Sequence, residues 1–474
     1  MRQIAAIALL ALRNVFRSRV VLILSALLFA AAFLLPLGIR SDGTPEGLIR
    51  LHLAYTLGIA SFLLALATLW AGCAAVSQEA DDKTLQLLLV KPVPRLRIWL
   101  GKWLALLLMD ALLLALVGAA ALFTLRRQLQ HGGFEPAALA AAEQTVLSAR
   151  ETLRAPLPDV EAYIRAEYAR LRAAGAIPAA AAESAVRDSL RRAELARRYS
   201  VAPGAERIWT FARPPAAGWR RAPPLAVQFK ADSSVPGAAD VTATVALRVG
   251  DREETREVRA MPGTLQTVLF DGSAAASGPI SVAFRNRGAH GATLFFDPAD
   301  GLVLRPAAGT FAGNYLRALG QLYLRLALFA AIGVTLGILF SMPVATFLTL
   351  VLILILQLSG FIVAAAQVDR AAFVANVAPF GATGHAHGEA VAAPSAAARA
   401  AATALFYAYR GTYLTLRPLL EDRTLDALSA GTYLPPRALR RNFLQQGLLL
   451  PACLALLSTA VLRRREWALP AING

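Results

Sequence analysis

The sequence predicts a polytopic α-helical membrane protein of about six transmembrane helices, with an α+β domain inserted on the extracytoplasmic side. Composition is the first indication, because 57% of the 474 residues are hydrophobic and only 17% are charged, which is unusual for a soluble chain. The second is a set of apolar runs of about 20 residues, the length that crosses a hydrocarbon core of roughly 30 Å. The third is the segment 125–317, which has no such run and carries soluble helix and strand patterns.

The apolar runs define the transmembrane helices. The stretch 322–366 is nearly twice the length of one span and is interrupted by Ser341-Met342-Pro343, so it predicts two spans joined by a tight turn. Residues 1–12 are followed by Arg13 and Arg17, and we expect an interfacial helix there rather than a secretory signal. The remaining predicted spans are 20–39, 54–76, 103–124 and 443–462.

The distribution of basic residues predicts the orientation in the membrane. The formal net charge is +17, and Lys and Arg are concentrated in the short segments 1–19 and 78–102 and in Arg463-Arg464-Arg465. Short basic loops stay in the cytoplasm, so both termini are expected there, whereas a long domain such as 125–317 crosses largely regardless of its charge. We find no nucleic-acid-binding motif, so no nucleic-acid partner is expected.

The membrane part of the chain falls into two pieces on either side of the inserted domain. Residues 1–124 are expected to hold the interfacial helix and the first three spans, and residues 318–474 the last three spans with an outer loop at 367–441. Within that loop, 396–416 is apolar, but a further span there would place the Arg463 to Arg465 run outside. We therefore expect an outer-face helix or a partial re-entrant segment.

The inserted domain, 125–317, has two compositional parts. Residues 135–200 are rich in Ala, Arg and Glu and predict two or three soluble helices, while 225–305 alternates in the manner of strands and predicts a small β-sandwich. Cys73 and Cys453 both fall in predicted spans, so no disulfide is expected to hold this domain. The predicted strands are 225–229, 241–249, 280–284 and 292–296.

No catalytic, cofactor or metal site is predicted in this chain. Gly101-Lys102 lacks the earlier glycine and the hydroxyl residue of a phosphate-binding loop, and no catalytic constellation stands out, so we do not expect an enzyme. The segment His385-Ala-His387-Gly-Glu389 offers three metal-ligand side chains, but it lies in a Gly- and Ala-rich loop, and a solvated loop is the favoured interpretation. Asp110 lies inside the third span, where a structural hydrogen bond and a part in a transport path are the two interpretations.

The segment 78–102 between the second and third spans carries the main functional indication. Its first half has acidic residues at the start and Lys91 at the end, which suits the dipole of a short helix. Pro92 and Pro94 then end that helix before the chain re-enters the membrane. A charged amphipathic helix held under the membrane between two spans is well placed to be displaced by a conformational change in a soluble partner.

The chain resembles the permease subunits of ABC-2 type ABC transporters. The six-span group that includes the permeases of nitrous oxide reductase maturation and of gliding motility is especially similar. The motifs that carry the resemblance are Arg13-Asn-Val-Phe-Arg-Ser-Arg19, Glu79 to Leu89, Lys91-Pro-Val-Pro-Arg95, Leu100-Gly-Lys102 and Arg464-Arg-Glu-Trp467.

The resemblance implies a coupling helix that docks on a separate ATP-binding subunit. The residues that it maps onto this docking and re-entry region are Glu79, Asp82, Thr84, Leu85, Leu88, Pro92, Pro94, Gly101 and Lys102. It also implies ATP and magnesium in the partner subunit, a homodimer or a heterodimer with a related permease, contact with membrane lipid, and a multi-pass location in the cytoplasmic (inner) membrane of a bacterium. The family usually joins its third and fourth spans by a short loop, so 125–317 is a departure from the pattern.

Two functions are therefore expected from the sequence. The first is the membrane-spanning permease subunit of an ABC-2 exporter with an unknown substrate, in which 125–317 is the candidate contact for an envelope partner. The alternative is a membrane-anchored envelope scaffold or sensor that acts through its extracytoplasmic domain. A co-purifying ATPase discriminates between them, because the scaffold needs none.

Overall fold

The computed structural model describes residues 2–38, 43–82, 93–177, 183–212, 224–235, 240–271, 280–288, 291–358, 363, 370–377, 395–420 and 423–464. The chain forms two compact units. The helical unit comprises Met1–Phe134, Tyr315–Ser429 and Leu434–Gly474, and the inserted unit comprises Glu135–Asn314 and Ala430–Tyr433.

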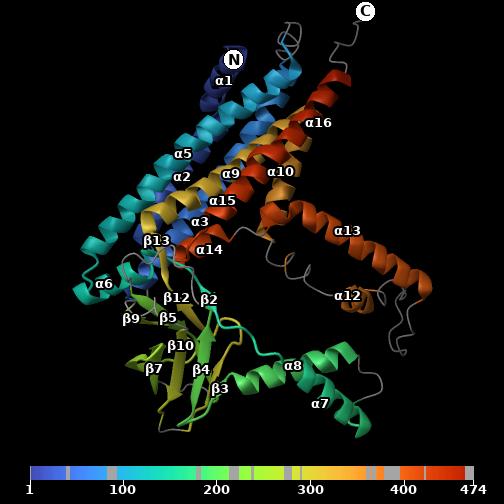
Figure 1. The fold of residues 1–474 in the computed structure, drawn as a ribbon. Helices are drawn as coiled ribbons and strands as arrows, with labels where there is room; N and C mark the ends of the chain where they lie inside the picture. The colour runs from blue at the N-terminus through green and yellow to red at the C-terminus, as the bar shows by residue number, and fades with distance from the viewer. Residues whose placement is uncertain are drawn as a thin grey trace, which may run out of the picture. The chain divides into compact units, whose positions relative to one another are not determined.

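The helical unit is built from long apolar helices that run side by side (Figure 1). Its first helix, α1, is amphipathic, and the short break at Ser18 separates it from the apolar α2. The helices up to the inserted unit are α1 (Arg2–Arg17), α2 (Arg19–Gly38), α3 (Pro45–Asp81) and α5 (Arg95–His131). Those after it are α9 (Phe311–Leu339), α10 (Met342–Gln357), α12 (Arg370–Val377), α13 (Ala396–Leu420), α14 (Thr424–Ser429), α15 (Pro436–Asn442), the π-helix η4 (Phe443–Leu449) and α16 (Leu450–Arg464).

Five helical segments of the described residues are long and apolar enough to cross a membrane. They include α2, α3, α5, α9 and the continuous run Pro436–Arg464. The predicted fifth span corresponds to α10, which has 16 residues, fewer than the roughly 20 that a bilayer core requires. The structure therefore supports a polytopic helical membrane protein, and the sixth span stays a prediction. The 25-residue helix α13 is not one of the five.

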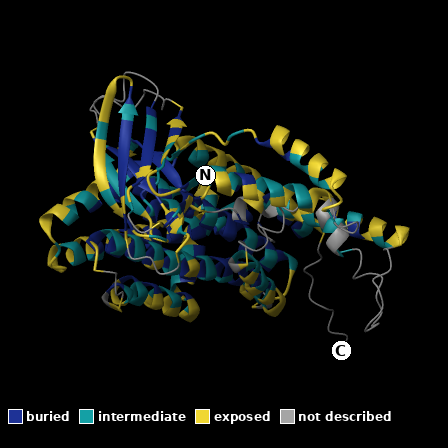
Figure 2. Ribbon diagram, turned by 90° about the horizontal axis from the view of Figure 1, so that it is seen from below, coloured by how far each residue is buried: buried dark blue, intermediate teal, exposed yellow. Residues whose placement is uncertain are grey.

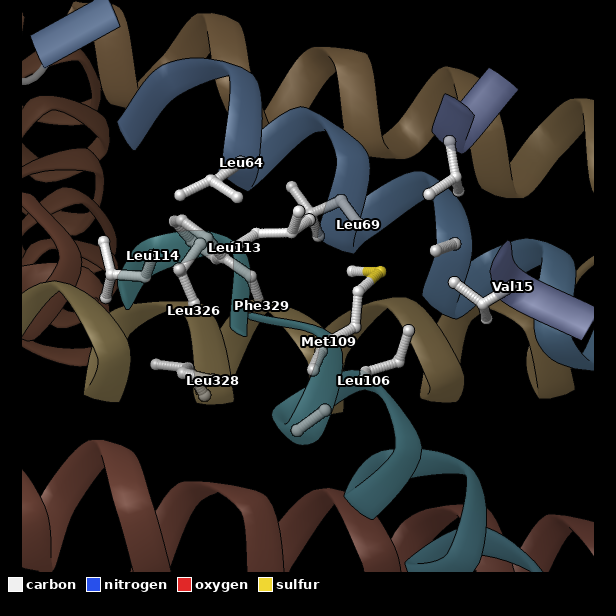
Figure 3. Packing of buried hydrophobic residues seen from close by; sticks show 14 of the residues in the cluster. Val15, Leu64, Leu69, Leu106, Met109, Leu113, Leu114, Leu326, Leu328 and Phe329 are labelled. Carbon is white, nitrogen blue, oxygen red and sulfur yellow. The ribbon is translucent and has the colours of Figure 1, made fainter. Parts of the chain in front are cut away.

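The core of the helical unit lies between α3, α5 and α9. Figure 3 shows Leu64 and Leu69 of α3 facing Met109 and Leu113 of α5, with Phe329 of α9 against them. All belong to one buried hydrophobic cluster. Three side-chain hydrogen bonds also join α5 to α9: Trp103 Nε1 to the Ala327 carbonyl at 2.8 Å, Tyr315 Oη to Gly118 at 2.8 Å and Tyr323 Oη to Leu107 at 3.3 Å.

In its described residues, the inserted unit contains three helices and antiparallel sheets. Residues between Pro136 and Arg198 form the predicted soluble helices, with two short strands among them. The helices are α6 (Pro136–Thr145), α7 (Glu161–Ala173) and α8 (Glu183–Arg198). The strands are β1 (Ser148–Arg150), β2 (Leu153–Arg154), β3 (Ser200–Val201), β4 (Glu206–Phe211), β5 (Leu225–Phe229), β6 (Ala231–Ser233), β7 (Val241–Val249), β8 (Arg252–Ala260), β9 (Gln266–Phe270), β10 (Ile280–Asn286), β11 (Leu294–Phe296), β12 (Leu302–Arg305) and β13 (Ala307–Thr310).

Two four-stranded sheets make up most of the β-rich part. Their strand orders are β4-β10-β7-β8 and β2-β12-β5-β9, and every pairing within them is antiparallel. Side chains from both sheets share one buried cluster, in which the rings of Phe229 and Phe284 lie edge to face with centroids 5.3 Å apart. The central strands are accordingly mostly dark blue in Figure 2. This arrangement matches the small antiparallel sandwich that strand alternation predicts.

A short piece of the C-terminal half of the chain completes the inserted unit. Residues Ala430–Tyr433 lie beside β1, where the Arg150 amide donates to the Gly431 carbonyl at 2.9 Å and the Tyr433 amide donates to the Arg150 carbonyl at 2.7 Å. Arg305 donates to the Ala430 carbonyl at 2.9 Å, and Asn314 Nδ2 donates to the Thr432 carbonyl at 2.8 Å. Segments more than a hundred residues apart in the sequence therefore share one polar core.

Arg150 organises this polar core from a buried position. Its side chain is 2% exposed and donates to the carbonyls of Gln144, Pro224 and Arg305 at 2.7 to 2.9 Å. Burial, and then the neighbouring Arg305 guanidinium, lower the pKa of Arg150 to about 10. The guanidinium is still charged near neutral pH, and the three carbonyl oxygens replace its lost hydration.

Candidate coupling site

The residues predicted to couple to a partner lie at the facing ends of α3 and α5. Glu79 belongs to the last turn of α3, Asp82 caps that helix, and Pro94 precedes the first residue of α5. Gly101 and Lys102 lie in the second turn of α5. The other predicted residues, Thr84, Leu85, Leu88 and Pro92, lie outside the described residues.

The structure differs from the sequence prediction over the acidic residues of this region. We expected Glu79, Asp81 and Asp82 to begin a short helix, but α3 continues without a break through Asp81. The carboxylates are then at the carboxyl end of a helix, where the negative pole of the helix dipole disfavours them. At least Glu79 therefore needs a compensating cation.

Lys102 supplies that cation. Its Nζ lies 2.6 Å from Glu79 Oε2 and also donates to the Ala75 carbonyl at 2.5 Å. The Lys102 side chain is 2% exposed, whereas that of Glu79 is 23% exposed. The pair therefore ties the end of α3 to the beginning of α5, on either side of residues 83–92.

Gly101 brings the amphipathic helix α1 against the same place on α5. A Cβ at Gly101 would lie 2.6 Å from Ile7 Cγ2 and 3.3 Å from the Ile4 carbonyl, both on α1, so only glycine allows this close approach. Arg97 also donates to Gln3 at 2.7 Å. The structure thus gives Gly101 a packing role between helices, with α1 as its neighbour.

A cavity of about 610 Å³ opens beside the C-terminal end of α3. It is lined on one side by the α1–α2 junction, including Arg17 and Arg19, and on the other by α3, including Gln78, Glu79 and Asp82. Residues of the basic segment 13–19 and of the predicted coupling segment, which are far apart in the sequence, therefore border one cavity.

Residues 5–141 match the family model of the ABC-2 family transporter protein. This region belongs to the ABC-2 transporter family. The match runs from α1 to α6 and so includes the Glu79–Lys102 pair and the whole of the predicted coupling segment. It covers less than a third of the chain, and almost all of the inserted unit lies beyond it. No curated protein and no solved structure gives a significant match.

An ABC-2 permease is a transport subunit without its own ATPase, and residues 5–141 contain the predicted coupling segment and three of the long apolar helices. Of these helices, α3 runs from the predicted coupling segment into the core. It crosses α9 at backbone distance: a Cβ at Gly333 would lie 2.7 Å from the Leu69 carbonyl, and one at Gly337 would lie 2.5 Å from the Cys73 carbonyl. Ser77 adds a hydrogen bond to the Gly337 carbonyl at 3.2 Å.

Our sequence interpretation missed this crossing of α3 and α9, although a signal was present. Gly333 and Gly337 are four residues apart in an apolar helix, the spacing of glycine-mediated helix packing in membranes. Such packing lets two backbones approach closely and leaves little freedom for independent movement. The structure therefore packs α3 closely against α9 along this crossing.

Asp110 is fully buried in α5, with its carboxyl group directed at α3. The Thr68 hydroxyl lies 2.6 Å from Asp110 Oδ1 and 2.7 Å from the Leu64 carbonyl. Among the described residues, Oδ2 has no hydrogen-bond partner. Of the two interpretations of Asp110, the geometry favours a structural hydrogen bond between α3 and α5, and a part in a transport path stays a hypothesis.

No metal centre is found in the part of the chain that the structure describes, since no group of three or more His, Cys, Asp or Glu side chains comes together there. The segment His385-Ala-His387-Gly-Glu389 lies outside that part.

Proposed function

We propose that this chain is the membrane-spanning permease subunit of an ABC-2 type exporter, driven by a separate ATP-binding subunit that binds ATP and magnesium. The family match over residues 5–141 carries this proposal. The functional permease is a dimer with a second copy or with a related permease, in the cytoplasmic membrane of a bacterium, with both termini in the cytoplasm.

The proposed mechanism follows the contacts of the helical unit. The ATP-binding subunit docks on the coupling segment, which in this account includes Thr84, Leu85 and Leu88. Closure of that subunit displaces the ends of α3 and α5 together, because the Glu79–Lys102 pair joins them. The α3–α9 crossing then carries the displacement into the core, and the substrate cavity changes from inward to outward access. Each nucleotide state must contact the segment differently for this shift to occur.

Co-purification tests this function. We expect the affinity-tagged full chain, extracted from its native membrane in a mild detergent, to retain a second chain that carries a Gly-x-x-x-x-Gly-Lys-[Ser/Thr] motif. The variant Leu85→Arg places a charge in the docking segment and should reduce that yield about tenfold or more.

Leu157→Arg is the matched control, because it adds the same charge at an exposed leucine of the inserted unit and should leave the yield unchanged. A monodisperse chain that retains no ATP-binding subunit would contradict the permease assignment and favour the envelope scaffold.

A further inference from the structure

A second cavity lies where the last long helical run, Pro436–Arg464, begins. Its volume is about 460 Å³, within the range of small-molecule sites. Its wall is formed by residues of α9, α13, α14, α15 and η4, together with Arg423 directly before α14, and all of them belong to the helical unit. Most of the side chains at this wall are polar, with arginines and amides prominent among them.

The cavity wall is positively charged. Three arginines line it, and no Asp or Glu of the described residues does. One of the three, Arg417, already interacts with another group. Arg423 and Arg441 are exposed, and neither side chain forms an ion pair or a hydrogen bond with a described residue. The structure thus places two available cations at one cavity.

Amide side chains add uncharged donors to this wall. Gln445 lies there, and its side chain also has no partner among the described residues. Asn442 Nδ2 donates to Gln321 Oε1 at 2.5 Å, which ties α15 to α9 and so fixes the helix that carries Arg441. An amide N–H donates to an anionic oxygen as a guanidinium N–H does, without adding charge.

The wall also includes a local departure from α-helical geometry. Pro451 lacks the N–H that would bond the Gly447 carbonyl in an α-helix, and the residues before it form the π-helix η4. Such π-helical turns are uncommon and are frequently found at functional sites. Gln445 and Gln446 both belong to η4 and both line the cavity. An uncommon backbone feature and the available donors therefore coincide at one place.

We propose that this cavity binds a phosphate group, with Arg423 and Arg441 as its main ligands and Gln445 as a further donor. A guanidinium forms two parallel hydrogen bonds with phosphate oxygens. A phosphate monoester carries about two negative charges near neutral pH, which matches the two available cations, whereas a carboxylate would compensate only one of them. The group can belong to a soluble phosphate or to the head group of an anionic lipid. The inference goes beyond the proposed function, because it assigns a ligand to a site outside the coupling segment.

Arginine footprinting of the full chain in dodecyl maltoside, an uncharged detergent without phosphate, tests the proposal. Phenylglyoxal modifies accessible arginines, and mass spectrometry of the peptides gives the rate at each residue. The ligands are inorganic phosphate, a phosphatidic acid and the diacylglycerol with the same chains. At about ten times the dissociation constant, at least one of the two phosphate compounds should slow modification of Arg423 and Arg441 roughly tenfold, and the diacylglycerol should not.

The same helix supplies the controls. Arg437 and Arg440 of α15 are exposed but lie outside the cavity wall, so their modification rates should not change. Arg441→Gln should raise the ligand concentration that protects Arg423 about tenfold or more. Arg440→Gln removes the same charge from the neighbouring position and should leave that concentration unchanged. Both substituted positions are exposed, so we expect both variants to fold.

The two phosphate compounds distinguish the sources of the ligand. Protection by inorganic phosphate indicates a soluble phosphate compound, whereas protection by phosphatidic acid alone indicates a lipid head group. The inference would be overturned by a lack of protection with both compounds, by equal protection with diacylglycerol, or by equal protection of Arg437 and Arg440. The measurement uses the chain without an ATP-binding subunit, so its outcome is independent of the co-purification that tests the proposed function.

Discussion

Replacing Glu79 with glutamine is expected to destabilise the helical unit by about 3 kcal/mol, because it leaves the buried Lys102 ammonium without a counter-charge. The reverse truncation, Lys102→Met, should cost far less. Lys102 is 2% exposed and Glu79 is 23% exposed, so a solitary Glu79 can still be hydrated while a solitary Lys102 cannot. The difference between the two variants can be measured by unfolding in a graded series of SDS concentrations.

The exchanged pair is the control for this prediction. Glu79→Lys together with Lys102→Glu restores the ion pair and also places the cation in the last turn of α3, which the helix dipole favours. We expect the double variant to regain most of the stability lost in Glu79→Gln. If the exchange is no more stable than the single variant, or if Lys102→Met is the more damaging change, the ion pair is not the link that we describe.

Enlarging either glycine of the α3–α9 crossing should have the second large effect. Gly333→Ala and Gly337→Ala each place a methyl group within 2.7 Å of a carbonyl oxygen of α3, and a backbone cannot rearrange as a side chain can. We expect a loss of about 2 kcal/mol or more for each variant, together with a reduced effect of the permease on ATP turnover. Thermal denaturation in one detergent, monitored by circular dichroism, measures the first effect.

Gly320→Ala is the matched control, because it lies on the same helix and its added methyl group would be 3.5 Å from Leu439, an ordinary contact. Alanine is the better helix former, so this variant should be unchanged or slightly more stable. Equal midpoints for Gly320→Ala and Gly333→Ala would show that the crossing is not tightly packed.

Hydropathy located the long helices well because the bilayer sets their length, but it located their ends poorly. The fourth span was expected to begin at 322, whereas α9 begins at Phe311, because Asn314 and Arg317 interrupt the apolar pattern without interrupting the helix. This difference moves Arg325 from the edge of a span to its centre.

The predicted coupling residues illustrate a different limit. Sequence similarity grouped Glu79, Gly101 and Lys102 as one site. In the structure, Glu79 and Lys102 form an ion pair with each other, whereas Gly101 packs against α1. Which side chain meets which depends on helix rotation, and a single sequence does not determine that rotation. The strands at 225–229 and 241–249 were predicted closely because alternation with a period of two is a local property.

The inserted unit shows the limit of local pattern most clearly. Nothing in the sequence around Ala430–Tyr433 connects it with a β-rich domain that ends more than a hundred residues earlier. Its hydrogen bonds with Arg150, Arg305 and Asn314 use mainly its backbone atoms, with the Thr432 hydroxyl as a further acceptor. Hydrogen bonds to backbone atoms do not depend on the side chains of the segment, so its residue pattern does not predict them. Glu135–Asn314 and Ala430–Tyr433 therefore form one compact unit, although they lie far apart in the sequence.

The most direct test of the account is ATP turnover by the assembled transporter in lipid nanodiscs, with the wild-type chain, Leu85→Arg or Leu157→Arg. We predict that the wild-type chain and Leu157→Arg alter the turnover of the ATP-binding subunit equally. Leu85→Arg should leave that turnover close to the value of the isolated subunit. A Leu85→Arg complex that hydrolyses ATP and responds to the permease as the wild type does would contradict the claim that this segment couples the two chains.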